Sequence, residues 1–174
     1  MQTPEGGKMT PEQITFLAMS GEAARASMKT TNVPASVTVA QAILESGWGK
    51  TGLAQKCNNY FGIKANQDQL ADRDYCEFPT TEYENGHRVV VEADFAKYDS
   101  PAECFVAHGQ LLNRPHYAAA MACVPNVDKF CWALGPKIPG HPEGCGYSTA
   151  PQYHDSLMQL IRLYNLTQYD SEGQ

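Results

Sequence analysis

The sequence contains no long uninterrupted hydrophobic run, so a membrane-spanning helix, which needs about 20 apolar residues, is not expected. Its first residues, MQTPEGGKM, have neither the basic start nor the apolar stretch of a secretory signal. Internal repeats and low-complexity tracts are also missing. We therefore expect a flexible leader over residues 1–9, one folded domain over residues 10–168 and a tail over residues 169–174.

Charged residues are scarce, at 18% of the chain, and they sum to a net charge of -6. An acidic chain without clustered lysine and arginine argues against nucleic acid as the main partner, because phosphate binding needs such clusters. Apolar residues reach 43%, which is ample for a continuous core and excludes wholesale disorder.

Common metal and redox motifs are missing. The five histidines show no H-E-x-x-H spacing, and no C-x-x-C pair offers a zinc or redox site. Cys104 falls in a helical pattern without the surroundings of a thiol nucleophile. We expect no metal and no cofactor. The even cysteine count favours disulfides in an oxidising compartment, although six buried thiols fit the same count. The six are Cys57, Cys76, Cys104, Cys123, Cys131 and Cys145.

The remaining sequence reads as helices around one hairpin. Thr10 is suited to cap a helix that runs to about residue 29, and Ser36 to cap one that ends at Ser46 before Gly47. Ser100 begins a helix to about residue 113, and Thr149 is a candidate cap for the last one. Further helices are predicted over residues 53–56, 115–123, 127–134 and 151–164.

Residues 75–98 have the character of strands. Val89, Val91, Ala93 and Phe95 alternate with more polar neighbours, and Asn-Gly at 85–86 is a strong signal for a hairpin turn. The pattern as a whole predicts an α+β fold that is predominantly helical.

Glu45 is the residue most suited to acid chemistry. It follows an almost wholly apolar segment, residues 39–44, at the C-terminal end of a predicted helix. Low dielectric and the negative helix end both favour the protonated carboxyl group, which can deliver a proton to a glycosidic oxygen. Taken alone, the pattern also suits an ordinary surface glutamate at a helix end.

The wider sequence resembles glycoside hydrolase family 73, the bacterial peptidoglycan β-N-acetylglucosaminidases. The most specific block is AQAILESGWGK at residues 40–50, followed by NNYFGIK at 58–64. The resemblance continues in family order through TTEYENG at 80–86, FAKYDS at 95–100 and GYSTAPQY at 146–153. It implies a lysozyme-like fold with a β-hairpin lobe across a glycan-binding cleft.

The resemblance also implies roles for particular residues. The family's general acid falls on Glu45, its second carboxylate on Glu82 and its active-site tyrosine on Tyr147. Glu82 would activate water or stabilise the oxocarbenium-like charge, unless the substrate's own acetamido group attacks. The pattern alone is equally consistent with Glu82 as an ordinary strand residue, and Glu77 and Glu84 are rival candidates for the second carboxylate. It is also consistent with Tyr147 as a core tyrosine. Sugar contacts are expected from Trp48, Tyr60, Phe61 and Tyr117, for which core packing is the alternative.

The implied activity is hydrolysis of the β-1,4 bond after N-acetylglucosamine in peptidoglycan. The alternatives are a muramidase or lytic transglycosylase on the same fold, a flagellar or wall-remodelling hydrolase, and a non-catalytic wall-binding module. With cysteines but no signal sequence, we expect an exported enzyme that acts in the periplasm of its own or of a target cell and does not bind the membrane. We favour a toxin that a cognate immunity protein neutralises.

Two features depart from the family pattern, namely the cysteines and the proline-rich loop at residues 137–145. The disulfide that we favour is Cys131–Cys145, because it would staple this loop before Tyr147. Cys104–Cys123 would then join consecutive helices, and Cys57–Cys76 would tie the catalytic segment to the hairpin.

Overall fold

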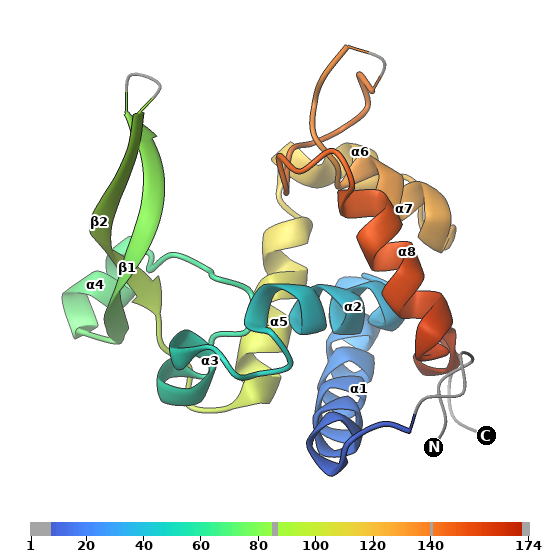
Figure 1. The fold of residues 1–174 in the computed structure, drawn as a ribbon, viewed down its shortest axis with the longest axis horizontal. Helices are drawn as coiled ribbons and strands as arrows, with labels where there is room; N and C mark the ends of the chain where they lie inside the picture. Colours follow the sequence, from blue (N-terminus) through green and yellow to red (C-terminus); the bar gives the residue numbers. More distant parts are fainter. Residues whose placement is uncertain (1–7, 85–86, 140, 172–174) are drawn as a thin grey trace.

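The computed structural model describes residues 8–84, 87–139 and 141–171, with side chains left out for residues 81–88. Helices form a body to which one hairpin is attached (Figure 1). The helices are α1 (Pro11–Thr31), α2 (Ala35–Ser46), α3 (Gly52–Cys57), α4 (Gln67–Asp72), α5 (Pro101–Leu112), α6 (Ala118–Met121), α7 (Val127–Ala133) and α8 (Tyr153–Leu163), with 3₁₀ turns η1 (Pro115–Tyr117) and η2 (Leu166–Tyr169). This confirms the predicted α+β class, whereas α4 was not anticipated.

The core forms where α1, α2, α5, α7 and α8 meet. Its largest fully buried apolar side chains are Phe105, Phe130, Leu112, Leu134, Leu157 and Leu166. Helices α1 and α5 approach closely because Gly109 has no side chain: a Cβ there would lie 2.6 Å from the Thr31 hydroxyl. Ser27 donates a hydrogen bond of 2.9 Å to the Phe105 carbonyl across the same contact. Small residues thus set the spacing of α1 and α5, and α5 supplies residues to the Glu45 cleft.

Helix beginnings follow the predicted caps only in part. Thr10 and Ser100 accept hydrogen bonds from backbone N–H groups at the third helical position, as expected. The prediction for Ser36 was wrong, because the residue is buried inside α2. Its backbone N–H instead donates to the Asp170 carboxylate at 2.7 Å. A carboxylate at a helix N-terminus satisfies a free donor and complements the helix dipole. Thr149 does not cap α8 either, since α8 begins after Gln152.

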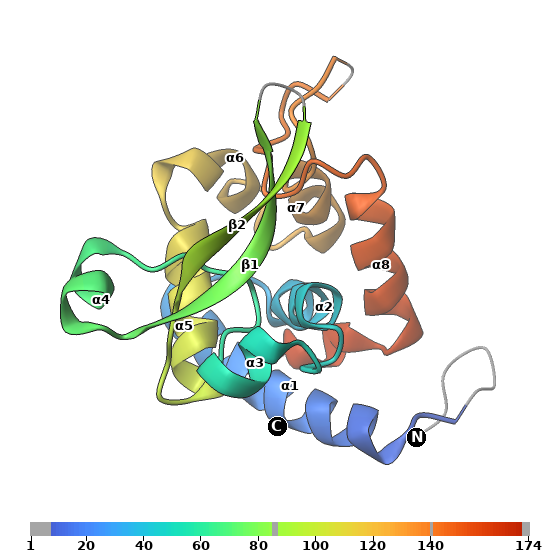
Figure 2. The ribbon, with the colours of Figure 1, turned by 60° about the vertical axis from the view of Figure 1, so that its left-hand side comes forward.

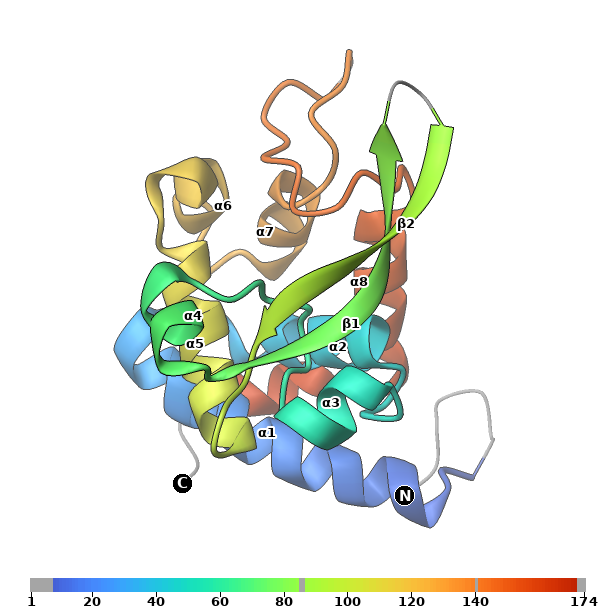
Figure 3. The same cartoon turned by 90° about the vertical axis from the view of Figure 1, so that its left-hand side faces the viewer.

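Strands β1 (Tyr75–Glu84) and β2 (His87–Ala96) pair antiparallel, from Tyr75 opposite Ala96 to Glu84 opposite His87. The hairpin extends away from the helical body, and helices α3 and α4 flank its base (Figures 2 and 3). Residues 85–86, the predicted Asn-Gly turn, lie outside the described residues. Val90 is 69% exposed while Phe95 is buried, which matches the predicted alternation.

The base of the hairpin is attached to the body by covalent and polar contacts. The Cys57–Cys76 disulfide joins the end of α3 to the start of β1. Asn59 Nδ2 donates to the Ala96 carbonyl at 2.8 Å, and the Ala96 N–H donates to the Ile63 carbonyl at 2.9 Å. Together these contacts hold the hairpin at its base. The disulfide confirms the Cys57–Cys76 prediction.

The two other predicted disulfides were wrong, because their four cysteines are free thiols that face different neighbours. Cys104 Sγ accepts a hydrogen bond from the Tyr60 N–H, whereas Cys123, in the turn after α6, has its Sγ 3.3 Å from the Ala119 carbonyl. Cys131 is buried on α7, and the Cys145 thiol lies beside the backbone of Tyr147. Proximity along the chain did not bring either pair together.

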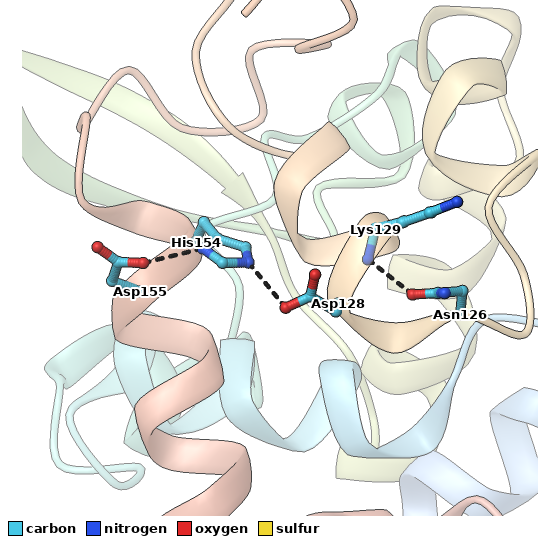
Figure 4. Close-up of polar contacts among 5 residues, drawn as sticks. All are labelled: Asn126, Asp128, Lys129, His154 and Asp155. Carbon is cyan, nitrogen blue, oxygen red and sulfur yellow. Dashed lines mark hydrogen bonds and ion pairs between the residues drawn. The ribbon is translucent and has the colours of Figure 1, made fainter.

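Helix α8 is tied to α7 by polar contacts around His154 (Figure 4). The His154 ring nitrogens lie 2.9 Å from Asp155 Oδ1 and 3.3 Å from Asp128 Oδ1. Asn126 caps α7 by accepting the Lys129 N–H at 2.9 Å. The loop between α7 and α8 rises above these helices, on the opposite side of the molecule from the hairpin (Figure 1).

Candidate active site

Glu45 lies in the last turn of α2, where a sharp change of chain direction ends the helix. Gly47, Trp48 and Gly49 follow with φ of 55°, 63° and 72°. This left-handed backbone suits glycine and is unusual for tryptophan. The Gly47 N–H donates to the Ile43 carbonyl and completes the helix end. The turn leaves Glu45 at the surface, although nearly all of α2 before it is buried.

Glu45 lines an open cleft of about 630 Å³. One wall comes from the C-terminal half of α5, a second from the segment at 61–69 that leads into α4, and the third from residues 147–148. The cleft is lined by Glu45, Phe61, Gly62, Ile63, Lys64, Ala65, Asn66, Gln69, Tyr98, Ala107, Gln110, Leu111, Arg114, Tyr117, Tyr147 and Ser148. Of the predicted site residues, the structure thus brings Glu45, Phe61, Tyr117 and Tyr147 together.

Two opposing effects act on the pKa of Glu45. Desolvation by the surrounding protein raises the pKa, and a hydrogen bond from Tyr153 lowers it, with a net rise above the usual glutamate value. No ion pair holds Glu45 as a carboxylate among the described residues. A raised pKa keeps a larger fraction of the carboxyl group protonated near neutral pH, which a proton donor to a leaving oxygen requires.

The contact with Tyr153 was missed in the sequence. Tyr153 donates a hydrogen bond of 3.0 Å from its hydroxyl to Glu45 Oε1, and Gln41 Nε2 donates to the same hydroxyl at 3.0 Å. Gln41 and Tyr153 are both buried. The sequence predicted Tyr153 only as an apolar residue of the last helix. A usable signal was Gln41, which is polar within an apolar run and lies one helical turn before Glu45.

Tyr147 lies against Tyr153 and Tyr117, with ring centroids 5.9 Å and 6.0 Å away. Burial raises its pKa well above the usual tyrosine value, and the negative charge of Glu45 adds to the rise. The phenol therefore remains protonated over the physiological range and is available as a hydrogen-bond donor at the cleft.

Phe61 forms part of the cleft floor and part of the core. It is 6% exposed and stacks on His108 with ring centroids 3.9 Å apart. Burial lowers the pKa of His108 to about 3, so the imidazole is neutral and acts as a flat packing surface. A sugar can reach only the small exposed part of the Phe61 ring.

Trp48 and Tyr60 are not in the Glu45 cleft. Both line a separate, shallow hollow of about 490 Å³ beside the start of α1. Trp48 packs edge-on against Phe16 and Tyr164, with ring centroids 5.8 Å and 4.9 Å away. Both residues make contacts typical of the core. The structure therefore does not bring them together with Phe61 and Tyr117, the other predicted sugar contacts.

Glu82 lies on β1, with its Cα opposite that of Val89 on β2. Its side chain lies outside the described part of the structure, so its distance from Glu45 does not enter the site geometry. Glu77 is five residues earlier on the same strand and therefore belongs to the other face of the hairpin. Among described residues no three His, Cys, Asp or Glu side chains form a group that could hold a metal ion.

Comparison with known proteins places these features in a family. Residues 21–166 match the family model Glucosaminidase, described as mannosyl-glycoprotein endo-β-N-acetylglucosaminidase. The exo-glucosaminidase LytG of Bacillus subtilis is 32% identical over 95% of this chain and 56% of its own length. The peptidoglycan hydrolase FlgJ of Salmonella typhimurium is 32% identical over 92% of this chain and 50% of its own length. The chain thus spans about half the length of these relatives.

Solved structures agree with the sequence comparison. The catalytic domain of the autolysin Auto from Listeria monocytogenes superimposes with a TM-score of 0.77 at 29% identity, covering 94% of this chain and 90% of that domain. A type VI secretion system effector–immunity complex from Pseudomonas protegens, at 16% identity and a TM-score of 0.56, shares the fold alone. The chain therefore belongs to the glucosaminidase family of glycoside hydrolases and has its lysozyme-like fold.

Proposed function

We propose that this domain hydrolyses the glycan strands of bacterial peptidoglycan as an endo-β-N-acetylglucosaminidase, with Glu45 as the general acid. The observation that carries the proposal is a carboxyl group of raised pKa at an open cleft, next to a protonated tyrosine, in a chain of this family. The description of the family model names a mannosyl-glycoprotein as the substrate. We favour peptidoglycan because FlgJ, at 32% identity, is named a peptidoglycan hydrolase.

In the proposed reaction, protonated Glu45 donates its proton to the glycosidic oxygen as the C1–O bond breaks. Tyr153 stabilises the carboxylate that remains, because its hydrogen bond favours the ionised form. Tyr147 would orient the substrate acetamido group or the reacting water. Glu82 would act from the hairpin, either by activating water or by assisting attack of the acetamido group.

Mass spectrometry of the products tests the bond preference. Digestion of purified sacculi is expected to release fragments with N-acetylglucosamine at the reducing end. A muramic acid reducing end would establish a muramidase, and a 1,6-anhydro product a lytic transglycosylase. The variant Glu45→Gln, which keeps the shape of the side chain but cannot donate the proton, should lose at least about 10²-fold in rate while folding normally. More than a tenth of wild-type activity in this variant would remove Glu45 as the acid.

The site of action is proposed to lie outside the cytoplasm, in the periplasm of the producing or of a target cell. The supporting features are the Cys57–Cys76 disulfide, which forms in oxidising compartments, and the location of the proposed substrate. No helix among the described residues has the length and hydrophobicity needed to cross a bilayer.

More specifically, we propose that the enzyme is a toxin and that an immunity protein binds over its cleft. The toxin role is supported by the fold shared with a chain of a type VI secretion system effector–immunity complex. Periplasmic expression with and without the neighbouring open reading frame tests it. Lysis that the neighbour suppresses would support the toxin role, and lysis that it leaves unchanged would contradict it.

A further inference from the structure

The cleft beside Glu45 is cationic, although the protein is acidic. The chain carries a net charge of -6, yet the charged residues that line the cleft are Lys64, Arg114 and Glu45. Lys64 and Arg114 outnumber Glu45, so the lining carries a net positive charge even when Glu45 is ionised. Two positive charges therefore dominate this concave surface, where they attract anions that the rest of the molecule repels.

Lys64 is held in a defined place by the hairpin base. Its ammonium group lies 4.1 Å from the centroid of the Phe95 ring, within the range of a cation–π contact. Lys64 also forms a backbone bridge with Phe95, and the neighbouring Ala65 N–H donates to the Asp94 carbonyl at 3.0 Å. Phe95 is buried and thus a firm support. No acidic partner pairs with Lys64 among the described residues.

Arg114 lies at the end of α5, where its N–H donates to the Leu111 carbonyl at 3.1 Å. The side chain is exposed, and within the described structure it makes neither an ion pair nor a hydrogen bond. Burial raises the pKa of the Tyr117 phenol, and the positive charge of Arg114 opposes this rise, as it does at Tyr98. The guanidinium group therefore lies near two phenols of the cleft, with its planar donors available to a carboxylate.

We propose that Lys64 and Arg114 form a carboxylate-binding subsite, which recognises the acidic substituent on the lactyl group of the muramoyl residue. The proposal rests on the proposed function, because it concerns the same cleft. Both sugar rings of peptidoglycan and their acetamido groups are neutral. Its negative charge lies on carboxylates attached through the lactyl ether, either those of the stem peptide or, where the peptide is missing, the lactyl carboxylate itself. Because every second sugar is a muramoyl residue, a subsite that binds its carboxylate would fix the position of the strand in the cleft. It would thereby determine which bond is cut.

The experiment compares three substrates that differ in this charge. Sacculi carry peptide carboxylates, amidase-stripped strands carry free lactyl carboxylates, and stripped strands with amidated carboxyl groups are neutral. Lys64→Gln and Arg114→Gln are each expected to lower the ratio of kcat/KM on a carboxylate-bearing substrate to kcat/KM on the neutral strands by about tenfold, mainly through KM. Added salt should lower the same ratio for the wild-type enzyme.

Matched controls separate local charge from net charge. Lys56 lies over the ring of Phe78 at 5.8 Å, outside the cleft, and Lys56→Gln should leave the ratio unchanged. Arg162→Gln on the exposed face of α8 serves the same purpose for arginine. Arg114→Lys, which restores a positive charge, should recover part of the ratio.

Each outcome then has one meaning. A loss confined to sacculi identifies the peptide carboxylates as the ligand, and a loss confined to stripped strands identifies the lactyl carboxylate. A loss on both shows that the subsite accepts either carboxylate. Equal loss on neutral strands, or no loss on any substrate, would overturn the subsite. A wild-type enzyme that cleaves none of the three would instead refute the proposed function.

Discussion

The Tyr153 hydroxyl donates a hydrogen bond of 3.0 Å to the Glu45 carboxylate from a helix that lies 108 residues further along the chain. Gln41 donates to the same hydroxyl at 3.0 Å, so the phenol oxygen is held from one side and directed toward Glu45 on the other. Desolvation and this hydrogen bond act in opposite directions on the pKa of Glu45. Their balance sets how much of the acid is protonated at a given pH.

The variant Tyr153→Phe removes the donor and should raise the pKa of Glu45 further. The alkaline limb of the kcat/KM profile, where the acid loses its proton, should therefore move to higher pH. Rate at the optimum should fall by about fivefold, which is the value of one hydrogen bond near 1 kcal/mol. Tyr164→Phe, which keeps the Trp48 contact, is the matched control. An unmoved alkaline limb would mean that Tyr153 does not tune the acid.

The same variant should also be less stable. Gln41 is fully buried, and its Nε2 would lose the only acceptor that the described structure gives it. An unsatisfied buried donor costs about 1–3 kcal/mol. Urea denaturation of Tyr153→Phe and Tyr164→Phe at one pH measures this difference.

Glu45→Gln should stabilise the fold at neutral pH. The pKa of Glu45 in the folded protein lies above its unfolded value, because the surrounding protein desolvates the carboxylate. Well below the ordinary glutamate pKa of about 4.3 the group is neutral in both states and has no effect. As pH rises toward the folded pKa, the unfolded chain loses its proton first, and stability falls. The amide avoids this loss.

Urea denaturation at acidic and at neutral pH measures the effect. The gain of Glu45→Gln over wild type should be present at neutral pH and should vanish at acidic pH. An equal difference at both would show that it does not arise from ionisation of Glu45.

Glu82→Gln should reduce turnover of sacculi by about tenfold or more if Glu82 acts in the reaction. Glu77→Gln provides the control, since it makes the same chemical change on the other face of β1. Full activity in Glu82→Gln would leave acetamido attack, or another base, as the second half of the mechanism.

Replacing Cys57 and Cys76 together by serine should lower the free energy of unfolding by about 3 kcal/mol, the loop-closure value for a separation of this size. Turnover should fall as well, because the bridge anchors the lobe that carries Glu82. Thiol titration under denaturing conditions should give four free cysteines in the wild-type protein. Cys123→Ser is the control and should change neither property.

Sequence by itself determined the local parts of this protein. Thr10 and Ser100 mark helix starts because a side-chain oxygen three residues away reaches a free N–H, and Gly47 ends α2 because its left-handed backbone is costly for other residues. These interactions span a few residues, so spacing reveals them. The position of Glu45 at the end of an apolar helix, and hence its candidacy as the acid, followed from the same short-range pattern.

Tertiary structure decided the contacts that join distant segments. Only the packing of α8 against α2 brings Tyr153 to Glu45, and only η2 brings Asp170 to the start of α2, in place of Ser36. Packing also separated Tyr117, which lines the cleft, from Trp48, which the left-handed turn directs toward Phe16. Such contacts depend on how whole helices fit together, and the residues that make them have no fixed spacing in the chain. Local pattern therefore singled out Glu45 as the candidate acid, while the packing of the helices selected the groups that contact it.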